Sequence, residues 1–238
     1  EVIRHITSAN IACGWHAGDP VVMDYTVRLA KRHNVGVGAH PGYPDLMGFG
    51  RRNMSLGRKE ITTYVAYQVG ALWAFSRMHS VRLQHVKAHG ALYNTAVDDP
   101  YVARAVAEAV LAIDPQLIFV GLAGPKGHNM RRVAMEMGLR VAFEAFPDRN
   151  YTPEGTLVPR KYENAVIHDP ELVKERAIMM AKEQKVVAVD RSVIPLEVHT
   201  LCVHGDNPKA LALVAGIREA LTKEGLTLAP MDQVLKGV

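Results

Sequence analysis

Histidine, carboxylate and cationic side chains recur where short apolar segments of this sequence end. In chain order, these residues are Asn10, His16, Asp19, His40, Lys87, His89, Glu144, Arg149, His204 and Asp206. Imidazole and carboxylate groups can bind a divalent metal or act as acid and base. A lysine at a buried strand end can pair with phosphate or carboxylate, or act as a nucleophile once desolvated. With the glycines around them, these residues predict a site for a small anionic substrate, with phosphate charge nearby.

Some of these residues have a plain structural alternative. Asp19 precedes Pro20, and Asp206 precedes Asn207-Pro208, so either carboxylate could serve only as a helix cap. His85 lies inside an apolar segment, where a buried core histidine is expected. Cys13 has no evident activating base, so a nucleophilic thiol is not expected there.

The apolar segments read as strands buried on both faces, because they are rich in Val, Ile and Leu with little alternation. The predicted strands span residues 6–13, 36–39, 83–87, 117–122, 140–145, 186–189 and 201–204. Helical patterns separate them at 20–33, 58–79, 99–113, 127–137, 170–184 and 208–224. This alternation predicts a parallel sheet, whose strands present their carboxyl ends on one face. We therefore expect the side chains of Asn10, His40, Lys87, Glu144 and His204 to meet at one pocket mouth.

Helix starts share an Asx-Pro pair. The pairs are Asp19-Pro20, Asp99-Pro100, Asp169-Pro170 and Asn207-Pro208. The Asx side chain can accept from free backbone N–H groups, and proline at the first helical position loses no hydrogen bond. One segment breaks the rhythm: residues 147–169 carry three prolines and no sustained period, which predicts an ordered lid rather than a linker.

Length and composition exclude several classes of protein. The 238 residues suit one α/β domain over 1–238. The net charge of +4 includes no long basic run, so nucleic acid is not an expected partner. There is no apolar stretch long enough for a membrane span and no signal-peptide pattern. Two cysteines are too few for a disulfide framework and suggest a reducing cytoplasm.

Known catalytic and nucleotide motifs are also missing from the sequence. There is no G-x-G-x-x-G after the first strand and no Walker P-loop. The H-E-x-x-H and G-x-S-x-G motifs are absent as well, which argues against a zincin and an α/β-type serine hydrolase.

Five blocks of the sequence resemble the signature blocks of the LamB/YcsF family. They are TSANIACGWHAGDP, GVGAHPGYPDLMGFGRR, LQHVKAHGALYN, FEAFPDRNYTPEGTLVPR and TLCVHGDNP, in the family's order. The resemblance implies a TIM-like distorted (β/α)7 barrel of the glycoside hydrolase/deacetylase type. The family's aspartate-rich first strand, of the form D-L-N-x-D-x-G-E, has no counterpart here. We therefore expect a barrel without that strand.

The same resemblance implies an activity. It is the ATP-dependent cleavage of 5-oxoproline to L-glutamate, carried out by the A subunit of a cytoplasmic 5-oxoprolinase together with the B and C subunits. The implied cofactors are ATP and Mg²⁺ or another divalent metal, and a homo-oligomer is left open. Two alternatives stay open: a metal-dependent amidase or deacetylase that needs no ATP, and a non-catalytic substrate-binding subunit.

For that chemistry we assign roles by residue type. The expected catalytic residues are His16, His40, Lys87, His89 and Glu144. The expected substrate- or phosphate-binding residues are Asn10, Arg149, His204 and Asp206. Asp19 is the candidate metal ligand.

Overall fold

The computed structural model describes residues 1–205 and 209–237. Contacts between residues divide the chain into two compact units. The first unit comprises Thr7–Gly121 and Asn129–Val141, and the second comprises Glu1–Ile6, Leu122–His128 and Ala142–Val238. The prediction of one domain over 1–238 stays a prediction, because compactness is not independent folding.

The first unit is built on parallel strands. They are β1 (Ser8–Ala12), β2 (Gly36–His40), β3 (Leu83–Val86) and β4 (Ile118–Leu122), adjacent in that order. In the register, Asn10 lies beside Gly38 and Ala12 beside His40. Every residue of β4 is buried, as a strand covered on both faces should be.

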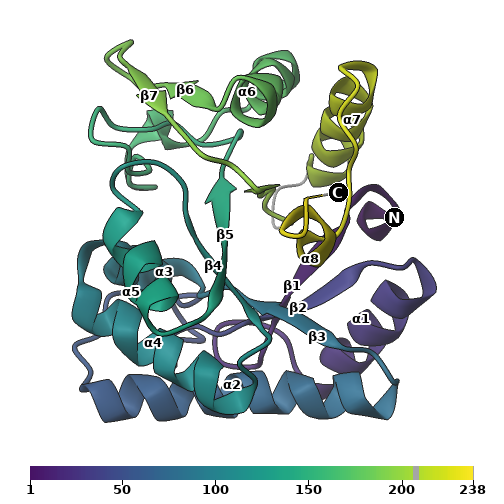
Figure 1. Ribbon diagram of the computed structural model, residues 1–238, viewed down its shortest axis with the longest axis vertical. Helices are drawn as coiled ribbons and strands as arrows, with labels where there is room; N and C mark the ends of the chain where they lie inside the picture. The colour runs from purple at the N-terminus through teal and green to yellow at the C-terminus, as the bar shows by residue number, and fades with distance from the viewer. Residues whose placement is uncertain (206–208, 238) are drawn as a thin grey trace. The chain divides into compact units, whose positions relative to one another are not determined.

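Five helices accompany these strands. They are α1 (Pro20–Arg32), α2 (Arg58–Met78), α3 (Gly90–Asp98), α4 (Pro100–Ile113) and α5 (His128–Glu136). Helix α1 contacts β1 and β2, while α2 contacts β2 and packs along α4 (Figure 1). Packing of helices onto a parallel sheet leaves the strand ends and the following loops as the places for polar side chains.

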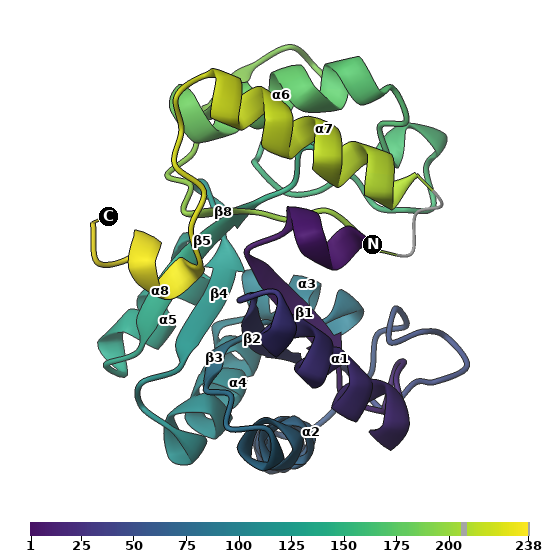
Figure 2. The ribbon, with the colours of Figure 1, turned by 90° about the vertical axis from the view of Figure 1, so that its right-hand side faces the viewer.

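The second unit begins with a 3₁₀ helix (Val2–His5), which contacts α7 (Ala210–Lys223). Strand β5 (Arg140–Ala145) enters this unit and pairs in parallel with β8 (Thr200–Leu201). Helices α6 (Pro170–Lys182) and α7 lie side by side (Figure 2). Val173 and Ala177 of α6 pack with Leu213 and Ile217 of α7. A short helix α8 (Met231–Val234) follows.

Three of the four predicted caps are confirmed. The carboxylate of Asp19 accepts from the backbone N–H of Val22 at 2.9 Å. Asp99 caps α4 through the N–H of Tyr101 at 2.8 Å. Asp169 caps α6 through the N–H of Glu171 at 3.0 Å. The fourth pair, Asn207-Pro208, lies outside the described residues.

One predicted strand forms a different structure. The run at 186–189, expected in the parallel sheet, gives β6 (Lys185–Val187), which pairs antiparallel with β7 (Val193–Pro195). Arg191 between them has φ 71°, and the Asp190 carboxylate accepts from the N–H of Ser192 at 3.0 Å. An Asx turn with one left-handed residue reverses the chain, so the next strand pairs with β6 in the antiparallel direction.

The segment at 147–169 is ordered, with a 3₁₀ helix at Glu163–Ala165. Isolated bridges join Arg149 to Val166 and Tyr151 to Leu157. Tyr151 is fully buried, and its hydroxyl accepts from the N–H of Phe146 at 3.0 Å. These bridges and the buried tyrosine hold the segment in place, and its action as a lid stays a prediction. No helix among the described residues is long and apolar enough to cross a membrane.

Candidate functional site

Three histidines from different loops meet in the first unit. His16 lies in the loop after β1, His40 ends β2, and His89 is the N-cap residue of α3. One ring nitrogen from each lies within 4.8 Å of the others. His16 and His89 are buried, and His40 is half-buried. The parallel strands thus bring together residues that lie far apart in the sequence.

Hydrogen bonds fix two of these rings. Nδ1 of His89 lies 3.1 Å from Nε2 of His40. The other nitrogen of each ring faces a backbone carbonyl: Nδ1 of His40 lies 2.7 Å from the oxygen of Lys87, and Nε2 of His89 lies 2.8 Å from the oxygen of Phe49. Each ring is therefore held by a hydrogen bond to a backbone carbonyl.

The third ring is held by stacking. His16 lies parallel to His89, with ring centroids 3.7 Å apart and planes at 4°. It lies edge-on to His40 at 5.5 Å. Its Nδ1 is buried without a hydrogen-bond partner. An unpaired buried imidazole nitrogen is costly, and such a group commonly marks a place where a ligand belongs.

Burial keeps the rings of His16 and His40 neutral. The pKa of His16 is lowered to about 3 by burial, then by the charges of His89 and Arg51. The pKa of His40 is lowered well below its usual value by burial, and Lys87, His89 and His16 add to this. A neutral imidazole keeps a lone pair that can accept a proton or bind a metal.

Glycines allow the loop at 48–52 to approach the rings. Gly50 has φ 65°, and a β-carbon built there would come 2.8 Å from both Cβ of His16 and Cδ2 of His89. A β-carbon on Gly42 would come 3.0 Å from Nδ1 of His16. Only glycine at position 50 permits both this backbone conformation and this contact.

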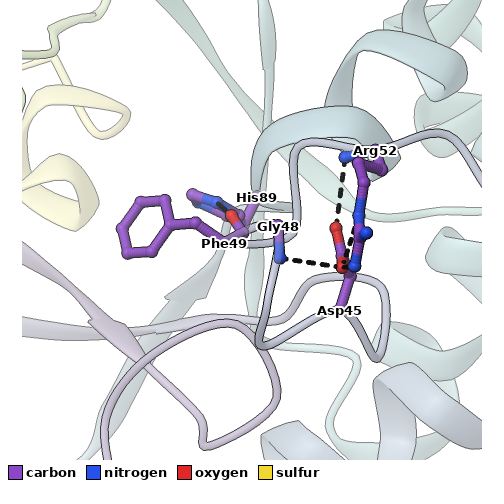
Figure 3. A network of polar contacts seen from close by, with 5 residues as sticks. All are labelled: Asp45, Gly48, Phe49, Arg52 and His89. Carbon is purple, nitrogen blue, oxygen red and sulfur yellow. Dashed lines mark hydrogen bonds and ion pairs between the residues drawn. The ribbon is translucent and has the colours of Figure 1, made fainter.

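An ion pair closes the same loop (Figure 3). The carboxylate of Asp45 accepts from the N–H of Gly48 at 3.0 Å and from Nε of Arg52 at 2.9 Å. These bonds, the side-chain hydrogen bond from Arg52 first, lower the pKa of Asp45 to about 2. The closed loop presents the carbonyl of Phe49 to His89. Sequence reasoning left Asp45 out of the site, although its place after β2 was visible.

The other predicted site residues of the first unit make contacts of their own. Lys87 follows β3, is buried, and places Nζ 5.8 Å from the centre of the Tyr93 ring. Asn10 directs Oδ1 at Nε2 of His85, 2.9 Å away. His85 is fully buried, as expected of a core histidine. Asp19 caps α1 and is not among the three clustered ligand candidates.

Cys13 is not set up as a nucleophile. Burial raises the pKa of its thiol to about 12, which leaves almost no thiolate at neutral pH. Its sulfur lies 3.2 Å from the backbone oxygen of Ile11. Both cysteines are buried.

The second unit has its own polar group. Nδ1 of His204 lies 3.1 Å from Oδ2 of Asp148, a buried residue whose Oδ1 has no hydrogen-bond partner. Glu144 is buried in β5. Arg149 donates from Nε to the oxygen of Ala165 at 3.0 Å and from Nη2 to the oxygen of Val158 at 2.6 Å.

With these hydrogen bonds, Arg149 stabilises the backbone of the segment 147–169. Its predicted role in anion binding stays a prediction. Asp206 lies outside the described residues. Asp148 was not among the predicted site residues, and its signal was its position shortly after the end of β5. The prediction of a pocket mouth shared by Asn10, His40, Lys87, Glu144 and His204 stays a prediction.

The donor set decides which metal the cluster suits. Three imidazoles without a carboxylate fit zinc or another late first-row ion. Magnesium prefers oxygen ligands, so these histidines do not fit it. An Mg²⁺ ion accompanying ATP would need other ligands.

Comparisons with known proteins agree with one another. Residues 1–236 match the LamB/YcsF family. The chain is 56% identical over 236 residues to the A subunit of 5-oxoprolinase from Pyrococcus furiosus, covering 99% of this chain and 91% of the relative. It is 54% identical over 236 residues to the corresponding 5-oxoprolinase chain of Alkaliphilus metalliredigens, with the same shares of 99% and 91%.

A solved structure agrees with the fold. The chain is 45% identical in sequence to a lactam utilization protein from Thermus thermophilus, and its fold matches the crystal structure of that protein with a TM-score of 0.89. The match covers 96% of this chain and 90% of that one. The expected TIM-like α/β fold is thereby confirmed. On its sequence and its fold, the chain belongs to the LamB/YcsF family.

Proposed function

We propose that this chain is the A subunit of a 5-oxoprolinase, which cleaves 5-oxoproline to L-glutamate with ATP together with the B and C subunits. The names of its relatives, 5-oxoprolinase and lactam utilization protein, support this substrate. The cluster of His16, His40 and His89 is the observation that carries an enzymatic role, because three imidazoles close together, one of them with an unpaired buried nitrogen, are typical of a functional site. The proposed location of the protein is the cytoplasm.

The need for ATP follows from the chemistry of the substrate. A lactam is a poor electrophile, and opening an unstrained five-membered ring at neutral pH is uphill. Transfer of the γ-phosphoryl group to the amide oxygen gives an imidate and ADP. Water then adds to that carbon, the ring C–N bond breaks, and the nitrogen takes a proton. The resulting acyl phosphate reacts with a second water to give glutamate and phosphate.

Each step asks for groups that the chain offers. The phosphoryl oxygens need positive charge, which the buried Lys87 supplies. The attacking water needs activation, which we assign to the histidine cluster. Glu144 keeps its expected catalytic role as part of this proposal. ATP binding is assigned to the complex and not to one particular chain.

Reconstitution tests the proposal. The full complex of this chain with the B and C subunits is given 5-oxoproline and ATP, and glutamate and ADP are measured. We expect His40→Ala and Lys87→Ala to abolish glutamate formation while circular dichroism stays unchanged. His128→Ala, at an exposed position, is the matched control and keeps full activity. Full activity in both site variants would remove the assignment.

A second candidate is a metal-dependent amidase that acts without ATP, because three clustered imidazoles are a typical donor set of catalytic metals. The same assay separates the two. Glutamate formation that needs no ATP supports the amidase. Binding of 5-oxoproline by the isolated chain, with turnover unaffected by the site variants, supports a substrate-binding subunit.

A further inference from the structure

We propose that His16, His40 and His89 form a binding site for a late first-row divalent metal ion, with zinc as the type case. The inference concerns the same side chains as the proposed function. It goes beyond that function, because it names an inorganic ligand and the atoms that hold it. It rests on the hydrogen-bond donors and acceptors around the three rings in the first unit, and it does not depend on which reaction the protein carries out.

Backbone carbonyls decide which ring nitrogens carry hydrogen. A carbonyl oxygen can only accept a hydrogen bond. Nδ1 of His40, 2.7 Å from the oxygen of Lys87, must therefore be an N–H. Nε2 of His89, 2.8 Å from the oxygen of Phe49, must be an N–H for the same reason.

The remaining two nitrogens then face each other with lone pairs. A neutral imidazole has one N–H, so Nε2 of His40 and Nδ1 of His89 are both acceptors. They lie only 3.1 Å apart. Two acceptors at this distance repel unless a cation lies between them. That cation is either one extra proton or a metal ion.

His16 discriminates between the two. A shared proton satisfies only the pair of His40 and His89 and leaves the buried Nδ1 of His16 without any partner. A metal ion takes a ring nitrogen from all three residues, which already lie within 4.8 Å of one another. In a tetrahedral zinc site with bonds of about 2.0–2.1 Å, ligand nitrogens are about 3.4 Å apart. The pair of His40 and His89 already has nearly this spacing.

The surroundings of the rings match those of metal ligands. A histidine that binds a metal usually donates its other N–H to a carbonyl or carboxylate, which fixes the ring and raises its basicity. His40 and His89 each make such a bond. Three protein ligands would leave one position of a tetrahedral ion for water or substrate.

Binding must also change the stack. The rings of His16 and His89 are parallel within 4°, with centroids 3.7 Å apart. One ion cannot lie in the planes of two parallel rings, so a shared ion requires His16 to tilt away from His89. The site is therefore formed by His40 and His89 and completed by a rotation of His16.

Metal titration of the whole chain tests the proposal. The purified protein is stripped with a chelator, titrated with Co²⁺ and then with Zn²⁺, and its metal content is measured by mass spectrometry. We expect one Co²⁺ per chain, with visible absorption bands typical of four-coordinate cobalt, displaced by Zn²⁺. His40→Gln and His89→Gln should weaken Co²⁺ binding at least about tenfold, and His128→Ala should bind as the parent does.

Other outcomes overturn the proposal. The first is that the parent protein binds no stoichiometric Co²⁺ or Zn²⁺, which is the result expected if His40 and His89 share a proton. The second is that the glutamine variants bind the metal as well as the parent does. A Zn²⁺-induced rise of the melting temperature in the parent but not in the glutamine variants separates lost binding from lost folding. Glutamate formation is measured in parallel. Turnover without metal binding refutes the site alone, and metal binding without turnover refutes the proposed function alone.

Discussion

Arg52 binds Asp45 from both its backbone and its side chain: its N–H lies 3.3 Å from Oδ2, and its Nε lies 2.9 Å from Oδ1. The pair closes a loop whose middle residue, Phe49, holds a left-handed conformation with φ 54°. The carbonyl of Phe49 fixes the ring of His89. An exposed arginine thus acts on a buried histidine through one turn of backbone.

The first prediction concerns Arg52 as a positioning residue. Arg52→Ala should release the loop and weaken Co²⁺ binding at the histidine cluster by about tenfold, as changes to groups that orient metal ligands commonly do. Arg32→Ala, another exposed arginine, should leave binding unchanged. Titration by visible absorption measures both variants. Equal affinities would mean that the loop keeps its shape without the ion pair.

The second prediction is a pH dependence of stability. The pKa of Asp45 is about 2 in the folded chain and 3.8 normally. Above the normal value, the carboxylate is ionised in both states, and its contribution to stability is complete. As the pH falls from about 4 to about 2, the unfolded chain takes up a proton first, so that contribution is lost. Denaturant unfolding of Asp45→Asn should show a smaller loss over this window than the parent.

The third prediction concerns Gly50. Alanine there would have φ 65° and a β-carbon 2.8 Å from side-chain atoms of His16 and His89. We expect Gly50→Ala to lower the free energy of unfolding by about 1–3 kcal/mol. Gly70→Ala, in helix α2 with nothing within 4 Å of the new β-carbon, should instead be stabilising by up to about 1 kcal/mol. Chemical denaturation of the two variants should move the midpoint in opposite directions.

The fourth prediction concerns Arg176 in the second unit. Its buried guanidinium donates to the backbone oxygens of Pro147 at 3.1 Å, Val187 at 3.2 Å and Arg149 at 2.8 Å. Arg176→Met leaves buried carbonyls without donors and should lower the free energy of unfolding by at least about 2 kcal/mol.

The segment 147–169 should also become easier to cleave, which limited proteolysis would detect. Glu175→Ala, on the exposed side of the same helix, is the control. An unchanged cleavage rate in Arg176→Met would mean that other contacts hold the segment.

Local patterns predicted most of the fold. The strand ending at His40 was visible because its apolar run stops at a polar residue followed by Pro41. The caps at Asp19, Asp99 and Asp169 were visible because a proline follows each. Helix α3 was missed, because its nine residues begin shortly after β3 and end at the next cap. The hairpin of β6 and β7 was missed, because one left-handed residue, Arg191, reverses the chain.

The site was predictable by residue type and not by role. His16, His40 and His89 could be grouped because polar strand ends of a parallel sheet converge. Their protonation could not be read, because it depends on which carbonyl faces which nitrogen. Arg149 illustrates the limit: a basic residue beside a strand end suggested anion binding, whereas its observed bonds are to the carbonyls of Ala165 and Val158.

The two compact units are both discontinuous in sequence, since the chain passes between them after Ile6, within β4, within α5 and within β5. No single cut releases either one intact: a fragment starting at Ala142 would lack Glu1–Ile6 and Leu122–His128. Truncated fragments are therefore poorly suited to assigning functions to the two units. Single-residue exchange in the complete polypeptide is the appropriate way to learn which part does what.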